Sequence, residues 1–173
     1  FGLPGAIGAC FANDRKKTIC ISGDGGLQMN IQELQTLVHY KLPIILFVLN
    51  NGGYLTIKLM QQNHFGRYIG SDPGSGVSCP DIIKVANAYG IKTERISNHD
   101  ELHDKIDSIL GHDEPFVCEI IMPEDQPLIP RVSSLKKPDG TIVSKPLEDL
   151  YPFLSREEFL ENMIVKPIEI LKE

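Results

Sequence analysis

The sequence predicts a doubly wound α/β domain with a mostly parallel sheet and helices on both faces. Three observations support this fold class. Short apolar segments alternate with segments of helical periodicity, the apolar segment 44–49 is continuous as in a strand buried on both faces, and glycine-rich turns follow two of the expected strands. Ligands of such folds bind at the carboxyl ends of the strands, so these two turns are the expected site.

The composition narrows the class of protein. The chain has 173 residues, of which 42% are hydrophobic and 23% charged, as in a globular domain. A net charge of −6 does not suit a nucleic-acid-binding protein, and the longest apolar segment is too short to cross a membrane. The four cysteines form no C-x-x-C pair, which favours reduced thiols. We therefore expect a cytoplasmic protein that binds neither nucleic acid nor a membrane.

The alternation of elements begins at the start of the chain. Pro4 lies near the beginning of a helix of small residues. Further along, Ile31, Leu34 and Leu37 share one helix face, and this helix must end before Pro43. The elements expected in this part are a helix over about the first ten residues, a strand over 18–22, a helix from Asn30 to before Pro43, a strand over 44–49 and a helix over 54–62.

The pattern continues to residue 122 and then changes. The elements expected here are a glycine-rich loop over 64–78, a helix over 82–89, a strand over 91–96, a helix over 99–110 and a strand over 116–122. Half of the 12 prolines then fall within 123–152, before a final helix capped by Ser155. We expect one domain over 1–122 and a Pro-rich extension over 123–173 packed on it, with upstream domains absent because the first residues read as the interior of a domain.

The two glycine-rich turns contain complementary ligands for a metal. Asp24 lies in the turn Gly23-Asp24-Gly25-Gly26, and Asn51 follows it past one helix and one strand, so both side chains are expected at the same sheet edge. A carboxylate, an amide oxygen and a backbone carbonyl suit Mg²⁺ carrying a phosphate, and glycines allow the backbone to approach that phosphate. Each turn alone is a common structural turn; their joint occurrence favours a metal-phosphate site.

These residues resemble the signature of the thiamine-diphosphate-dependent enzymes. Gly23-Asp24-Gly25 with Asn50-Asn51 resembles the family motif, and segment 23–34 is similar to its acetolactate synthase version. Segments 1–9, 80–90 and 125–130 also resemble that group, so the likeness covers about residues 1–130. It implies a C-terminal domain that binds thiamine diphosphate and Mg²⁺.

The resemblance assigns roles to individual residues. It implies that the metal ligands are the Asp24 carboxylate, the Asn51 side chain and the Gly53 carbonyl. The cofactor-binding residues that it implies are Gly23, Asp24, Gly25, Gly26, Asn51, Gly53, Tyr54 and Leu55. The family often has glycine where this chain has Leu55, which implies a less close backbone approach at that position.

The resemblance also implies an activity. An enzyme of this kind decarboxylates a 2-oxo acid such as pyruvate and ligates the product to a second carbonyl, as a homodimer or homotetramer. The activating glutamate comes from another domain, usually of a second subunit, so this chain is expected to hold no catalytic side chain and to be inactive alone. The alternatives are a 2-oxo-acid decarboxylase or another carboligase of the family and, from a different class, a non-catalytic thiamine- or nucleotide-binding module.

Other polar residues are weaker candidates. His64 and Arg67 lie in the glycine-rich loop, where substrate contact and a purely structural role are both open. His99 and His103 have the spacing of a zinc-binding pair, but the sequence offers no third ligand and favours a solvated helix face.

Overall fold

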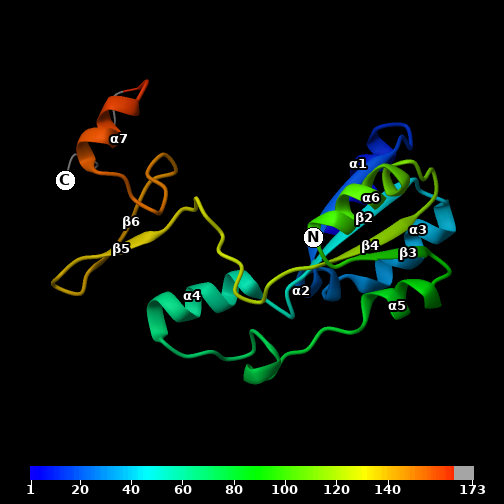
Figure 1. Ribbon diagram of the computed structural model, residues 1–173, viewed down its shortest axis with the longest axis horizontal. Helices are drawn as coiled ribbons and strands as arrows, with labels where there is room; N and C mark the ends of the chain where they lie inside the picture. Colours follow the sequence, from blue (N-terminus) through cyan, green and yellow to red (C-terminus); the bar gives the residue numbers. More distant parts are fainter. Residues whose placement is uncertain (166–173) are drawn as a thin grey trace. The chain divides into compact units, whose positions relative to one another are not determined.

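The computed structural model describes residues 1–165 (Figure 1). The chain divides into two compact units, Phe1–Gln126 and Pro127–Glu173. The predicted extension runs to residue 173, and its part over 166–173 lies outside the described residues. The first unit carries the sheet and both glycine-rich turns.

The first unit contains a parallel sheet. Its strands are β1 (Thr18–Gly23), β2 (Ile44–Asn50), β3 (Lys92–Ile96) and β4 (Phe116–Ile121), in the order β1-β2-β4-β3. Every neighbouring pair in this sheet is parallel, so all four carboxyl ends lie at one edge. The α/β fold class expected from the sequence is therefore confirmed.

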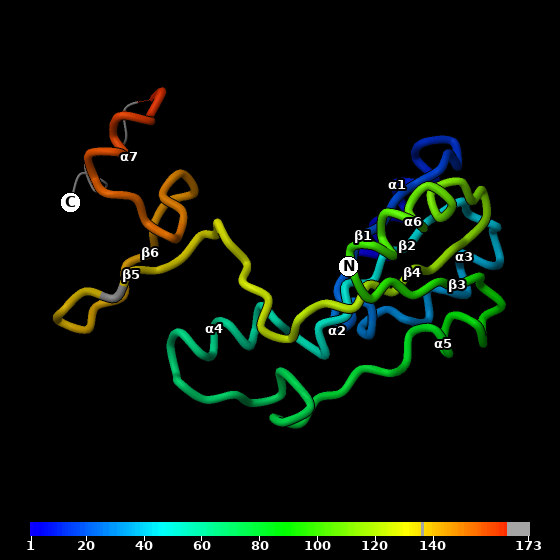
Figure 2. The backbone as a smooth tube through the Cα atoms, viewed as in Figure 1, coloured from blue at the N-terminus to red at the C-terminus, as the bar shows by residue number. Residues whose placement is uncertain are grey.

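Helices cover both faces of this sheet. They are α1 (Gly2–Ala12), the short α2 (Asp24–Gln28), α3 (Leu34–Tyr40), α4 (Leu55–Phe65), α5 (Ile82–Ala88) and α6 (His99–Leu110), with 3₁₀ turns at Ile31–Glu33 and Pro73–Ser75. Figure 2 shows that α4 and the segment after it run outside the layered part of the unit. They extend from the carboxyl end of β2, beside the turn that contains Asn51.

The central strand β2 divides the core into two parts. Its residues Ile44, Leu46 and Val48 pack into one apolar cluster with residues of α1, α3 and α5. Its residues Ile45 and Phe47 pack into a second cluster with residues of α6. Because adjacent residues of a strand point to opposite faces, a continuous apolar strand serves both clusters. Right-handed crossovers place α6 opposite α3 and α5, since the chain turns back from β3 to β4.

One helix begins earlier than the sequence predicts. The chain enters α2 at Asp24, directly after Gly23, and the helix expected from Asn30 is a 3₁₀ turn followed by α3. Asn30 has φ −137°, which interrupts helical geometry between the two helices. The apolar spacing therefore identified the buried face correctly but not the start of the helical segment.

The second unit is small and contains a hairpin that the sequence did not predict. Strands β5 (Ser134–Lys136) and β6 (Ile142–Ser144) pair antiparallel, and α7 (Arg156–Asn162) follows. The Ser155 side chain accepts the Glu158 N–H at 3.2 Å, as the predicted cap requires. None of the helices within residues 1–165 has the length and apolar character that a membrane crossing needs.

Candidate functional site

The two turns singled out in the sequence are neighbours in the sheet. Strands β1 and β2 pair in parallel with Gly23 opposite Leu49, so both strands end at the same level. Asp24 and Asn51 follow these strand ends directly. The expected juxtaposition of the two turns is therefore present.

Three buried oxygens at these strand ends have no hydrogen-bond partner. Asp24 is 0% exposed, and among the described residues neither oxygen of its carboxylate nor Oδ1 of Asn51 has a donor. A buried carboxylate without a partner is strongly destabilising, and such groups in native proteins mark a missing water, ion or ligand. The arrangement offers oxygen ligands of the kind that a hard divalent cation prefers.

The electrostatics of Asp24 agree with this description. Burial raises the pKa of the Asp24 carboxyl above its ordinary value. The N–H groups of three neighbouring glycines and the thiol of Cys79 oppose the shift only in part, and none of them makes a hydrogen bond of standard geometry to the carboxylate. The charged form of Asp24 is thus under-stabilised by the protein alone, and a cation beside it would compensate.

Cys79 is a neighbour of this carboxylate that the sequence did not indicate. Burial and then the charge of Asp24 raise the pKa of the Cys79 thiol to about 11. The thiol therefore stays protonated near neutral pH. It adds no second negative charge to the site.

Two glycines bring backbone close to Asp24. A Cβ on Gly25 would lie 2.7 Å from the Tyr54 ring and 3.0 Å from the Gly53 carbonyl oxygen, so a side chain there would displace the neighbouring turn. Gly53 has φ +151°, and a Cβ on it would collide with the carbonyl of Ser71. Only glycine fits this conformation without strain. The close approach of the two turns therefore depends on both glycines.

Gly23 and Gly26, two further candidates for cofactor binding, have more space around their Cα atoms than Gly25 and Gly53 have. A Cβ on Gly26 would lie 3.4 Å from Ser22 Oγ, and one on Gly23 would be 4.0 Å from the Leu49 carbonyl oxygen. Both positions therefore tolerate a small side chain sterically. Leu55 begins α4 with its side chain buried, 9% exposed, and Tyr54 caps the same helix.

The loop after α4 is tied back to the second turn. The Tyr54 N–H donates to the carbonyl of Ser71 at 2.8 Å. Lys58 of α4 pairs with Asp72 at 2.9 Å, and the Asp72 side chain accepts the Ser75 N–H at 2.9 Å. These contacts join residues that are far apart in the sequence, so the pattern gave no sign of Ser71.

The other sequence candidates do not join the site. His64 lies in the last turn of α4 and Arg67 in the following loop; both are exposed, and no described contact joins either to Asp24. His99 and His103 are exposed on α6. Within residues 1–165 no group of three or more His, Cys, Asp or Glu side chains could hold a metal, so the pair on α6 lacks a third ligand.

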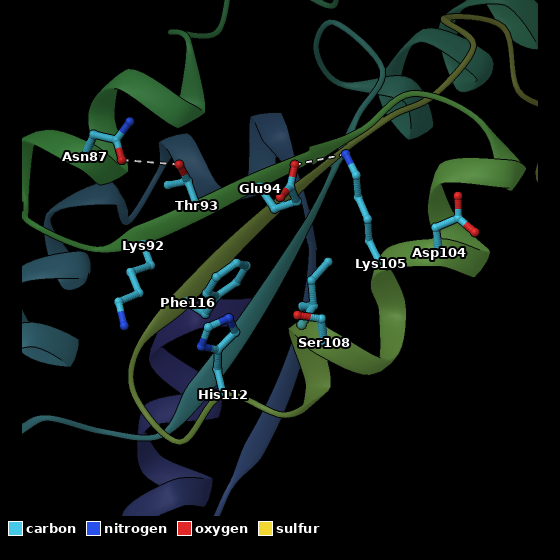
Figure 3. Close-up of a pocket in the computed structure, with 10 residues that line it drawn as sticks. Asn87, Lys92, Thr93, Glu94, Asp104, Lys105, Ser108, His112 and Phe116 are labelled. Carbon is cyan, nitrogen blue, oxygen red and sulfur yellow. Dashed lines mark hydrogen bonds and ion pairs between the residues drawn. The ribbon is translucent and has the colours of Figure 1, made fainter.

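A separate cavity lies between β3 and α6 (Figure 3). Several of its polar side chains pair with one another: Lys105 donates to Glu94 at 3.0 Å, and Thr93 donates to Asn87 at 3.2 Å. None of the signature residues lines it. Among the described residues that line this cavity, none has a buried polar side-chain atom without a hydrogen-bond partner, in contrast with the strand-end turns.

Comparisons with known proteins identify the family. The chain matches the family model described as "Thiamine pyrophosphate enzyme, C-terminal TPP binding domain" over residues 1–120. It is 36% identical over 134 residues to the acetolactate synthase large subunit of Cyanidium caldarium, covering 77% of this chain and 23% of that protein. It is 31% identical over 175 residues to the probable acetolactate synthase large subunit of Methanocaldococcus jannaschii, covering 100% of this chain and 28% of that protein.

A solved structure agrees. The thiamine diphosphate-dependent 4-hydroxybenzoylformate decarboxylase of Rhodococcus jostii RHA1 matches with a TM-score of 0.62 and 27% identity, over 72% of this chain and 23% of that chain. The chain thus spans about a quarter of the length of these relatives. It belongs to the thiamine pyrophosphate enzyme family, of which it carries the C-terminal TPP-binding domain in an acetolactate-synthase-like form.

Proposed function

We propose that the two strand-end turns form the diphosphate half of a Mg²⁺-dependent thiamine diphosphate site. The metal ligands would be the Asp24 carboxylate, the Asn51 side-chain oxygen and the Gly53 carbonyl. The observation that supports this most is that the unpartnered, buried oxygens of Asp24 and Asn51 follow the ends of two paired strands. Mg²⁺ commonly takes one or two protein groups together with phosphate oxygens, which fits so small a ligand set.

Charge explains why the metal is needed. Asp24 alone would repel a diphosphate, because both carry negative charge. A divalent cation between them attracts both groups and satisfies the carboxylate, whose pKa is raised by burial. The metal and the diphosphate would therefore bind together.

The glycines and the start of α4 would define the diphosphate side. Gly23, Gly25 and Gly26 have no side chains to cover the backbone of the first turn, and Gly25 is buried against Gly53 and Tyr54. The Leu55 side chain packs inward, which leaves the backbone at the start of α4 to border the cofactor. These residues would bind and orient; none of them would transfer a proton.

The reaction of the whole protein follows from the cofactor. Bound thiamine diphosphate supplies the electron sink for loss of CO₂ from a 2-oxo acid. We propose an acetolactate-synthase-like enzyme, in which a 2-oxo acid such as pyruvate loses CO₂ and its carbonyl carbon forms a bond to the carbonyl carbon of a second substrate. The catalytic glutamate would come from upstream domains of a second subunit in a homodimer or homotetramer. This chain would anchor and orient the cofactor for that partner.

A decarboxylase is the second candidate within the family. The structural neighbour is by its name a 4-hydroxybenzoylformate decarboxylase. Supplying pyruvate to the whole protein and analysing the products separates the two: a carboligase joins two substrates, whereas a decarboxylase releases an aldehyde. A non-catalytic thiamine- or nucleotide-binding module would give neither product.

Titration calorimetry tests the proposed site. Thiamine diphosphate should bind this chain more tightly with Mg²⁺ than with EDTA, and Asp24→Ala should remove this difference. Asp104→Ala, which changes an exposed aspartate of α6, is the matched control and should bind like the wild type. The same affinity for thiamine diphosphate with Mg²⁺ and with EDTA would contradict the proposal. A higher affinity for ADP than for thiamine diphosphate would contradict it too.

A further inference from the structure

A second buried carboxylate lies beside the turn that follows β2. Glu119 of β4 is 1% exposed, and both of its oxygens have partners. Oε1 accepts a hydrogen bond from Asn50 Nδ2 at 2.7 Å, and Oε2 accepts one from Arg95 Nε at 2.6 Å. The rest of β4 is apolar apart from Cys118, and burying a charge there is costly. The position therefore calls for a role beyond packing.

Asn50 connects this carboxylate to the second turn. Its Nδ2 donates to Glu119, and its Oδ1 accepts the Gly52 N–H at 3.1 Å. Rotating the amide by half a turn would place Oδ1 against the carboxylate and Nδ2 against an N–H donor, which removes both hydrogen bonds. The amide is thus held in one orientation. Gly52 lies between Asn51 and Gly53, two of the proposed metal ligands.

The sheet register explains why these side chains meet. Glu119 lies opposite Val48 of β2 and opposite Arg95 of β3. Val48 and Asn50 share a strand face because they are two residues apart, so Asn50 is the diagonal neighbour of Glu119 on that face. The hydrogen bond between Asn50 and Glu119 therefore joins the two central strands of the sheet, β2 and β4.

The positive charge of Arg95, which is partly exposed to solvent, compensates the negative charge of the buried Glu119 carboxylate. The Arg95 side chain is 47% exposed, and Glu119 raises the pKa of its guanidinium, first by hydrogen bonding and then by charge. Arg95 also lies 3.6 Å from Asp81, whose side chain caps α5. Because Arg95 reaches water, replacing Glu119 with an uncharged residue would leave no buried cation. Such a variant can be expected to fold.

We propose that Glu119 is a positioning residue for the metal. Through Asn50 it fixes Gly52, and thereby holds the Asn51 oxygen and the Gly53 carbonyl toward Asp24. This role rests on the proposed function of the two turns. A purely structural role predicts a different result, because an ion pair that only joins β3 to β4 would affect unfolding without affecting the turn.

The test uses Glu119→Met, whose side chain has no oxygen to accept from Asn50 Nδ2, and Asn50→Ala in this chain. Both variants should bind thiamine diphosphate with Mg²⁺ roughly 10- to 100-fold more weakly, the usual effect of changing a residue that orients metal ligands. Raised Mg²⁺ should restore saturation. Amide hydrogen exchange at Gly52, measured without cofactor, should be faster in both variants. Asn50 is only partly buried, so Asn50→Ala alone tests the positioning role if Glu119→Met does not fold.

A control on the other face of the sheet tests whether the effect depends on the place of Glu119 or only on the loss of one negative charge. Glu94→Met makes the same substitution at an acid on β3 that pairs with Lys105 at 3.0 Å, and it should alter neither the Mg²⁺-dependent affinity nor exchange at Gly52. Wild-type affinity and wild-type exchange in both test variants would overturn the positioning role. If Asp24→Ala keeps the metal dependence, the proposed site itself is wrong and the positioning role for a metal falls with it.

Discussion

Two buried aspartates of this chain have opposite surroundings. Asp149, in the second unit, is 1% exposed, and Arg156 donates to its two oxygens at 2.9 and 2.8 Å while Lys145 lies 3.3 Å away. Asp24, in the first unit, is 0% exposed and has no such partner within residues 1–165. Hydrogen bonding to Arg156 lowers the pKa of Asp149, whereas burial raises that of Asp24. A buried acid with partners stabilises its unit, and one without them requires a ligand.

Removing the paired acid should have the largest effect on stability. Asp149→Asn would lose the charge-assisted contacts of Arg156, and we expect the second unit to lose roughly 2–3 kcal/mol, less than a fully buried pair because Arg156 reaches solvent. Hydrogen exchange over 127–165 measures this loss. Glu148→Gln, an exposed neighbour, is the control and should leave exchange unchanged. Equal exchange rates in the two variants would mean that the ion pairs of Asp149 do not stabilise the second unit, which would contradict the contrast with Asp24.

A side chain at Gly25 should disturb the unpaired aspartate's surroundings next. The methyl group of Gly25→Ala would meet the Tyr54 ring and the Gly53 carbonyl, so we expect a cost of about 2 kcal/mol in unfolding free energy and weaker cofactor binding. Gly8→Ala in α1 is the control, since nothing lies within 4 Å of its added methyl group and Gly8 is not among the proposed cofactor-binding residues. Denaturant unfolding and calorimetry of the two variants measure the difference. Similar losses in both would argue against a close approach at Gly25.

Removing the unpaired charge should have a smaller effect of the opposite sign. Without metal, Asp24→Asn replaces an under-stabilised buried carboxylate with a neutral amide, and we expect the protein to gain about 1 kcal/mol. Thermal unfolding with EDTA measures this gain. With Mg²⁺ and thiamine diphosphate the order should reverse, because only the wild type binds the metal tightly. A variant that is less stable than the wild type under both conditions would contradict this account.

The two aspartates should also respond oppositely to pH. The raised pKa of Asp24 means that its contribution to stability is complete below the ordinary aspartate value, near 3.9, and is lost as pH rises through the raised value. The lowered pKa of Asp149 means that its contribution is present above the ordinary value and is lost as pH falls through the lowered one. Hydrogen exchange of each unit across acid pH without metal, compared with Asp24→Asn and Asp149→Asn, measures these slopes. If both residues changed stability in the same direction with pH, the account of their opposite surroundings would be contradicted.

The parts of this site that were predictable are those set by local pattern. The apolar segment 44–49 identified a strand buried on both faces, and parallel pairing then brought Asp24 and Asn51 to one sheet edge. The start of α2 at Asp24 was missed, because Gly25 and Gly26 read as a turn although they continue a helix.

Long-range contacts were beyond the sequence pattern. Ser71 and Glu119 support the second turn from distant positions, and neither lies in a recognisable motif. The hairpin β5–β6 was missed because proline content favoured an extended segment. Such contacts depend on how separate elements pack, which periodicity along one element does not encode.

The most direct test of the central claim is to locate the metal. Mn²⁺, which also prefers oxygen ligands, can replace Mg²⁺ in crystals grown with thiamine diphosphate, and its anomalous scattering marks its position. The account predicts one strong peak within coordination distance of the Asp24 carboxylate, the Asn51 side-chain oxygen and the Gly53 carbonyl. Bound thiamine diphosphate with no peak at these residues, or with a peak elsewhere, would contradict it.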